Sequence, residues 1–175
     1  MNTLRLSFAL LVLGLLCACG DQPSKPVQPL TDQQIMERME DANRHLAHEE
    51  EMAIVDYVRR HQLETVATGT GLRYQVLGTC DGPLIQEGQT VTLSYELYDL
   101  DDEVLYHSDN DGLMRFMVGR SDVPSGLDEA VRQLHVGDSA CVIVPSHLGY
   151  GLMGDKKAIP SWATLIYRLK IIKVD

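Results

Sequence analysis

The chain has 175 residues, which is enough for one domain with a hydrophobic core and a short appended element. Its formal net charge of −10 at pH 7 argues against nucleic-acid binding, which needs a basic surface. Two Phe and one Trp stand against seven Tyr, so the aromatic chemistry of any site is mostly phenolic.

The N-terminal residues have the pattern of an export signal. Arg5 precedes an apolar run, Phe8 to Leu16, that is too short to span a bilayer and is typical of the core of a signal peptide. The run ends in Leu16-Cys17-Ala18-Cys19-Gly20, which resembles the lipobox of bacterial lipoproteins. An ordinary secretory signal that happens to contain cysteines is the alternative.

The lipobox resemblance implies that residues 1–18 are removed and that Cys19 is lipidated. Ala18 supplies the small residue before the cut, although Cys17 is a second candidate for the modified thiol. A diacyl or triacyl anchor holds a protein stably at a membrane. We therefore expect a lipid-anchored protein that faces the periplasm, and Gly20 favours the outer membrane by resemblance to enterobacterial sorting.

Two further cysteines lie in the body of the chain, Cys80 in a turn and Cys141 in an apolar strand. An oxidising compartment would permit a disulfide between them, but nothing in the sequence requires one. We expect both to be buried free thiols.

A proline-containing tether, residues 19–30, leads to an acidic helical segment, residues 31–64. Thr31 and Gln34 have the spacing of a capping box that starts a helix. The pattern predicts one long helix, or two segments with a bend, that packs on the following domain or pairs with a second copy of the chain. Apolar residues recur at helical spacing in two groups: Ile35, Met39, Ala42 and Leu46, and then Ala53, Ile54, Tyr57 and Val58.

A cluster on this segment could be drawn as a metal site. His45, His48 and Glu49 have helical spacing, but a solvated helix face explains them better. We expect no metal there.

From Gly71 the apolar period changes from about 3.6 to 2, which predicts strands. One helical pattern interrupts them, at residues 127–134. Antiparallel strands with a single helix predict an α+β fold for residues 66–175, in which the helix covers one face of a curved sheet. The predicted strands are residues 72–77, 91–97, 104–107, 116–118, 140–144 and 164–174.

The same region resembles FKBP-type peptidyl-prolyl isomerases in four linked motifs. The order and spacing of the motifs hold over residues 88–175, with one small deletion near residues 110–113. With the lipobox and the acidic helix, they also resemble the gliding-motility-associated FKBP lipoproteins of Bacteroidetes. The motifs are GQTVTLSY at 88–95, VPSGLDEAV with LHVGDSA at 123–140, VPSHLGYG at 144–151 and IPSWATLIY at 159–167.

The activity that this resemblance implies needs no nucleophile, metal or cofactor. Rotation about a peptide bond costs about 18–20 kcal/mol, and X–Pro bonds exchange over tens to hundreds of seconds without a catalyst. A catalyst needs an apolar cup that binds the proline ring, excludes water and favours the twisted amide. The implied partners are proline-containing unfolded or partly folded polypeptides.

The resemblance also implies the residues of the cup. Leu127 would form its floor, Tyr95 and Tyr167 its walls, and Met114 its edge. The Tyr150 hydroxyl would donate to a substrate carbonyl, and Val123–Pro124 would offer backbone groups. The full set is Tyr95, Leu105, Tyr106, Met114, Val123, Pro124, Leu127, Tyr150, Ile159 and Tyr167.

Some of these positions depart from the family's usual residues. Leu105-Tyr106 replaces Phe-Asp, Leu127 replaces the more common Trp, and Met114 replaces a common Phe. The cup remains apolar, but Tyr106 offers a neutral hydroxyl where the family has a charge. Two functions follow: an envelope prolyl isomerase that assists the folding of exported proteins, or a catalytically weak chaperone, binding module or structural partner in an envelope complex.

Overall fold

The computed structural model describes residues 30–78, 81–120 and 123–175. The expected leader, the lipidation site Cys19 and the thiol of Cys80 lie outside the described residues. The chain divides into two compact units, Met1–Glu40 and Asp41–Asp175. Within the described ranges, none of the helices combines the length and the apolar character that crossing a membrane requires.

Helix α2 (Asp32–Arg60) is the one long helix that the sequence permitted. Its capping box is confirmed, because the Thr31 amide donates to Gln34 Oε1 at 3.0 Å and the Gln34 amide donates to Thr31 Oγ1 at 3.3 Å. On the solvated face, His45 Nε2 lies 3.1 Å from Glu49 Oε1, and both side chains are exposed. No group of three metal-binding side chains is found in the described part of the chain.

The first apolar group of this helix is exposed, including Ile35, Met39 and Leu46. Pairing of this helix with a second copy of the chain stays a prediction. From the second group, Ile54 and Tyr57 are buried on the sheet, at 1% exposure each. The C-terminal half of the helix therefore packs on the domain that follows it.

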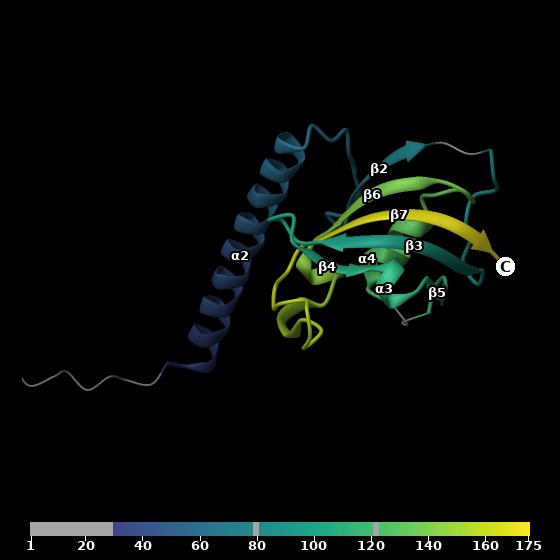
Figure 1. Ribbon diagram of the computed structural model, residues 1–175. Helices are drawn as coiled ribbons and strands as arrows, with labels where there is room; N and C mark the ends of the chain where they lie inside the picture. The colour runs from purple at the N-terminus through teal and green to yellow at the C-terminus, as the bar shows by residue number, and fades with distance from the viewer. Residues whose placement is uncertain (1–29, 79–80, 121–122) are drawn as a thin grey trace, which may run out of the picture. The chain divides into compact units, whose positions relative to one another are not determined.

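The second unit contains a seven-stranded antiparallel sheet in the order β1-β2-β6-β7-β3-β4, with β5 paired to β3 (Figure 1). All six predicted strands form, with ends within two residues of the expected positions. The additional strand β1 is only two residues long, so it has no periodic signal. The strands are β1 (Val66–Ala67), β2 (Arg73–Gly78), β3 (Thr90–Tyr98), β4 (Val104–His107), β5 (Met114–Met117), β6 (Ser139–Val144) and β7 (Leu165–Val174).

Two short α-helices, where the sequence predicted one, and two 3-10 helices, η1 (Ser146–Leu148) and η2 (Gly151–Met153), complete the unit among the described residues. Helix α4 (Ser125–Val131) ends three residues before the predicted end, because Gln133 and Leu134 close tighter turns onto Ala130 and Val131. Helix α3 (Ser108–Asp111) was not predicted, since four residues give no helical period.

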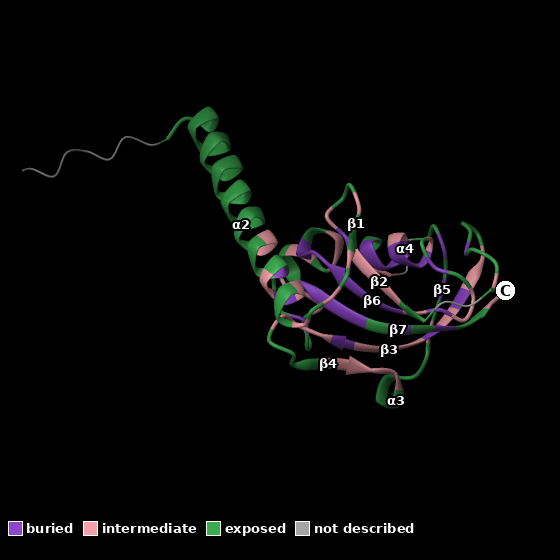
Figure 2. Ribbon diagram, turned by 90° about the horizontal axis from the view of Figure 1, so that it is seen from above, coloured by how far each residue is buried: buried purple, intermediate pink, exposed green. Residues whose placement is uncertain are grey.

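Successive side chains of β6 and β7 point to opposite faces of the sheet, and both faces are covered. On one face, residues such as Val142 and Tyr167 pack in the main core against Leu127 of α4. On the other face a smaller cluster forms under the C-terminal half of α2, and Figure 2 shows the buried positions on these strands. This smaller cluster contains Ile54, Tyr57, Cys141, Ile143 and Ile166.

Cys141 is a buried free thiol, as expected for this position, and burial raises its pKa. In the same cluster, the Tyr57 hydroxyl donates to Asp102 at 3.1 Å. Burial and this hydrogen bond together raise the pKa of Tyr57 to about 12. The helix is thus joined to the turn after β3 as well as to the sheet.

Candidate active site

The residues predicted for the cup come from several strands, from α4 and from the loop before β7, and most of them meet in one cluster. Leu127 on α4, Ile159 in the loop before β7 and Tyr167 on β7 are buried, at 0%, 3% and 1% exposure. Five partly buried side chains pack against the core that contains these three: Tyr95 on β3, Leu105 and Tyr106 on β4, Met114 on β5 and Val123 before α4.

Tyr95 and Tyr167 lie close together in this cluster, and Tyr150, which is 39% exposed and is not part of the cluster, lies near Tyr167. The rings of Tyr95 and Tyr167 are 6.4 Å apart between centroids, tilted by 50°. Burial raises the pKa of Tyr167, and the nearby hydroxyls of Tyr150 and Tyr95 raise it further. Burial, followed by the charge of Asp155, also raises the pKa of Tyr150. All three side chains are therefore neutral hydrogen-bond donors near neutral pH.

The start of α4 places the floor of the cup. The Pro124 carbonyl accepts hydrogen bonds from the Leu127 amide at 3.0 Å and the Asp128 amide at 3.2 Å. Gly126 lets the helix approach β6 closely, because an added Cβ would lie 2.4 Å from Val144 Cγ1. Proline has no N–H, so Val123 is the backbone donor of the Val123–Pro124 pair.

A carboxylate that the sequence reasoning missed organises the loop before β7. Asp155 Oδ1 accepts the amides of Lys157 and Ile159, each at 2.8 Å, and its Oδ2 accepts the Tyr106 hydroxyl. An Asp that binds amides two and four residues later is a known turn signal, which could have identified it. Tyr106 therefore contacts a negative charge, which Asp155 of the loop supplies.

The electrostatics of this pair follow from those bonds. The hydrogen bond to Asp155, more than desolvation, raises the pKa of Tyr106. For Asp155, desolvation is the largest single effect and acts upward. The bonds from Tyr106, Ile159 and Lys157 together outweigh it and lower the pKa of the carboxyl. The carboxylate is thus ionised near neutral pH and holds Ile159 in place.

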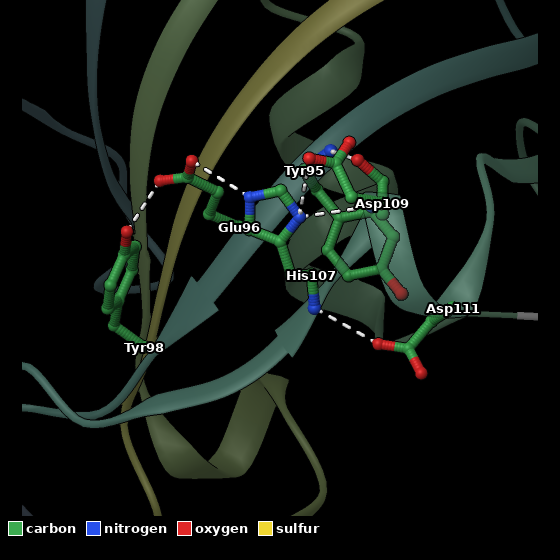
Figure 3. A network of polar contacts seen from close by, with 7 residues as sticks. Tyr95, Glu96, Tyr98, His107, Asp109 and Asp111 are labelled. Atoms are coloured by element: carbon green, nitrogen blue, oxygen red, sulfur yellow. Dashed lines mark hydrogen bonds and ion pairs between the residues drawn. The ribbon is translucent and has the colours of Figure 1, made fainter.

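A second polar network lies beside Tyr95 and joins β3, β4 and α3 (Figure 3). His107 Nε2 lies 3.1 Å from Glu96 Oε1, and the Tyr98 hydroxyl donates to the other oxygen of Glu96. The bond from Tyr98, followed by that from His107, lowers the pKa of Glu96. The Tyr95 amide donates to Ser108 Oγ at 3.2 Å, so the wall residue is tied to α3.

The motifs of the sequence are matched by known proteins. Residues 82–172 fit the family model of the FKBP-type peptidyl-prolyl cis-trans isomerases. The peptidyl-prolyl cis-trans isomerase Fkbp12 of Drosophila melanogaster is 32% identical over 116 residues, which cover 65% of this chain and 97% of that protein. The isomerase FKBP1A of Xenopus laevis is 28% identical over the same shares of the two chains.

Solved structures agree on the fold. A peptidyl-prolyl cis-trans isomerase from Pseudomonas syringae matches with a TM-score of 0.64 at 18% identity, covering 75% of this chain and 95% of its own. AtFKBP13 matches with a TM-score of 0.61 at 22% identity, covering 64% of this chain and 99% of its own. The curved sheet, the helix packed on it and the apolar cluster define a prolyl isomerase domain. The chain belongs to the FKBP-type peptidyl-prolyl cis-trans isomerase family.

Proposed function

We propose that this isomerase acts on proline-containing segments of exported polypeptides at the bacterial envelope, where a lipid on Cys19 holds it. The observation that carries the proposed chemistry is the joint placement of neutral phenols around an apolar floor. The envelope location is supported by the export signal, by the small residue before Cys19 and by the tether that follows.

Catalysis in such a cup follows from the polarity of the amide. Water stabilises the planar, more polar amide, so moving the prolyl bond into an apolar cup favours the twisted form. In the proposed complex, Leu127 and Tyr167 contact the proline ring and Tyr150 donates to a substrate carbonyl, which fixes the orientation of the peptide. A millionfold acceleration corresponds to about 8 kcal/mol of preference for the twisted state.

The first test is the rate of cis–trans exchange of a Leu-Pro peptide. Tyr150→Phe is expected to lower kcat/KM by about tenfold, since it removes one neutral hydrogen bond worth about 1.4 kcal/mol. Exchange spectroscopy measures the rate. Tyr98→Phe is the matched control, because its hydroxyl contacts Glu96 on the same strand and Tyr98 is not among the residues of the cup. Equal rates for the Tyr150→Phe variant and the wild type would remove Tyr150 from the site.

The anchor is tested by fractionating bacterial cells that produce the full chain. Cys19→Ser should release the protein from the membrane fraction, because no thiol remains for lipidation at that position. Cys17→Ser is the control and should leave the protein at the membrane. Release by Cys17→Ser alone would assign the lipid to Cys17, and retention of a double variant that lacks both thiols would exclude a lipid anchor.

A second candidate is a chaperone or binding module with little turnover, or a structural partner in an envelope complex for motility or secretion. It is favoured by the aliphatic floor at Leu127 and by the engagement of the Tyr106 hydroxyl with Asp155. The exchange assay separates the two. Suppression of client aggregation without acceleration of Leu-Pro exchange would favour the second candidate.

A further inference from the structure

A carboxylate on helix α2 binds both ends of the loop that carries Tyr150 and Ile159. Glu50 Oε1 accepts the Ser146 amide and the Thr164 hydroxyl, both at 2.6 Å, and Glu50 Oε2 accepts the Ser146 hydroxyl at 3.0 Å. These partners are 96 and 114 residues away along the chain. Ser146 follows the end of β6, and Thr164 directly precedes β7. One side chain therefore joins the two stems of the loop.

Burial makes these hydrogen bonds necessary. Ser146 is 1% exposed and Thr164 is 4% exposed, so water cannot readily replace a lost acceptor. Glu50 is partly exposed, which leaves its charge partly hydrated, and bonds to a charged acceptor are stronger than bonds between neutral groups. Ile54 and Tyr57, one turn and two turns further along α2, are buried on the sheet. The helix backbone at Glu50 is therefore held in a defined place.

The same loop is organised from inside by Asp155, which holds the Ile159 amide and contacts Tyr106. Asp155 fixes the middle of the loop, and Glu50 fixes its two ends. Glu50 is not among the residues of the cup. Its effect on a substrate would pass through Ser146 and Thr164 to the loop between them.

We propose that Glu50 is a positioning residue of the isomerase: it sets the geometry of the loop that presents Tyr150 and Ile159 to the prolyl bond. The inference rests on the proposed pocket, because it requires these two residues to meet the substrate. A cup held in its working geometry stabilises the twisted amide without reorganisation. Loosening the stems should therefore lower kcat more than it raises KM.

The test compares three variants of the purified protein in the Leu-Pro exchange assay. Glu50→Ala is expected to lower kcat/KM by about tenfold, which corresponds to about 1.4 kcal/mol, chiefly through kcat. Glu50→Gln keeps a carbonyl oxygen for the Ser146 amide and the Thr164 hydroxyl, and its NH₂ group can donate to Ser146 Oγ. We expect this variant to retain activity within about threefold of the wild type.

Glu49→Ala is the matched control. Glu49 is the preceding carboxylate on the same helix, its side chain is 61% exposed and it pairs with His45. Its removal should leave kcat and KM unchanged. Hydrogen–deuterium exchange of residues 146–163 supplies a second measurement that needs no turnover, and Glu50→Ala should accelerate exchange in that segment first.

A purely stabilising contact would give a different result. It would lower the melting temperature and raise exchange throughout the domain, yet leave kcat unchanged well below the melting temperature. If Glu50→Ala does not fold, Thr164→Val removes one donor while nearly preserving the side-chain shape. Its kcat should fall while that of Glu50→Gln is retained, because the glutamine still accepts the hydrogen bond that Thr164→Val removes.

The proposal is overturned if Glu50→Ala keeps kcat/KM within about twofold of the Glu49→Ala control, given the tenfold loss that a missing bond should cause. If the wild type itself does not accelerate exchange, the proposed pocket fails. In that case, hydrogen exchange in residues 146–163 still decides whether Glu50 holds the loop.

Discussion

Gly154→Ala is expected to reduce kcat/KM by about a hundredfold, which corresponds to about 2.7 kcal/mol. Gly154 has φ +58° and ψ −163°, a region that costs other residues about 1–3 kcal/mol. An added Cβ would also lie 2.2 Å from the Ile159 carbonyl oxygen and 2.9 Å from the Pro160 carbonyl carbon. Both atoms belong to the backbone, so the segment that carries Ile159 has to move.

The control for this variant is Gly69→Ala. A Cβ at Gly69 meets no atom within 4 Å, so neither activity nor stability should fall. The rate of Leu-Pro exchange and the thermal unfolding of both variants check the prediction. A Gly154→Ala variant with wild-type kcat/KM would show that the conformation of this loop does not matter for catalysis.

Leu127→Ala is expected to lower the free energy of unfolding by about 2–5 kcal/mol and to remove most isomerase activity. Leu127 is fully buried, so truncation leaves a cavity under the proposed proline site. Urea unfolding measures the stability, and exchange of the Leu-Pro peptide is measured at a temperature where the variant stays folded.

Leu134→Ala separates the two effects of that substitution. Leu134 is equally buried, but it follows the other end of α4, where its carbonyl accepts the Ile85 amide at 3.0 Å. Its truncation should cost a similar stability, about 2–5 kcal/mol, while kcat/KM is retained. If both variants lose activity equally, Leu127 acts through core packing alone and is not the floor of the cup.

The strands of this domain were predictable because their side chains alternate between two environments. Residues of β3 such as Val91, Leu93 and Leu97 point into the core, and the polar residues between them do not. The elements that were missed are short: β1 and α3 contain two and four residues, too few for a period to show.

The site was predictable only where it depends on linked motifs. The cluster of Leu127, Ile159 and Tyr167 follows from the FKBP resemblance, which the comparisons confirm at the level of the family. The roles assigned to single residues of the cup stay predictions, as do the domain boundaries and the lipid at Cys19. Asp155 and Glu50 were missed for different reasons. The first needed the turn geometry of its own loop, and the second needed a contact between distant parts of the chain.

The position of Cys141 gives the protein an internal reporter of helix opening. The thiol is 4% exposed and shares a cluster with Ile54 and Tyr57 of α2. A thiol reagent reaches the buried thiol only after this contact opens. Under conditions where reclosure is fast, the rate of Cys141 alkylation measures the free energy of that opening. Covalent labelling can thus follow the attachment of the helix independently of the catalytic rate.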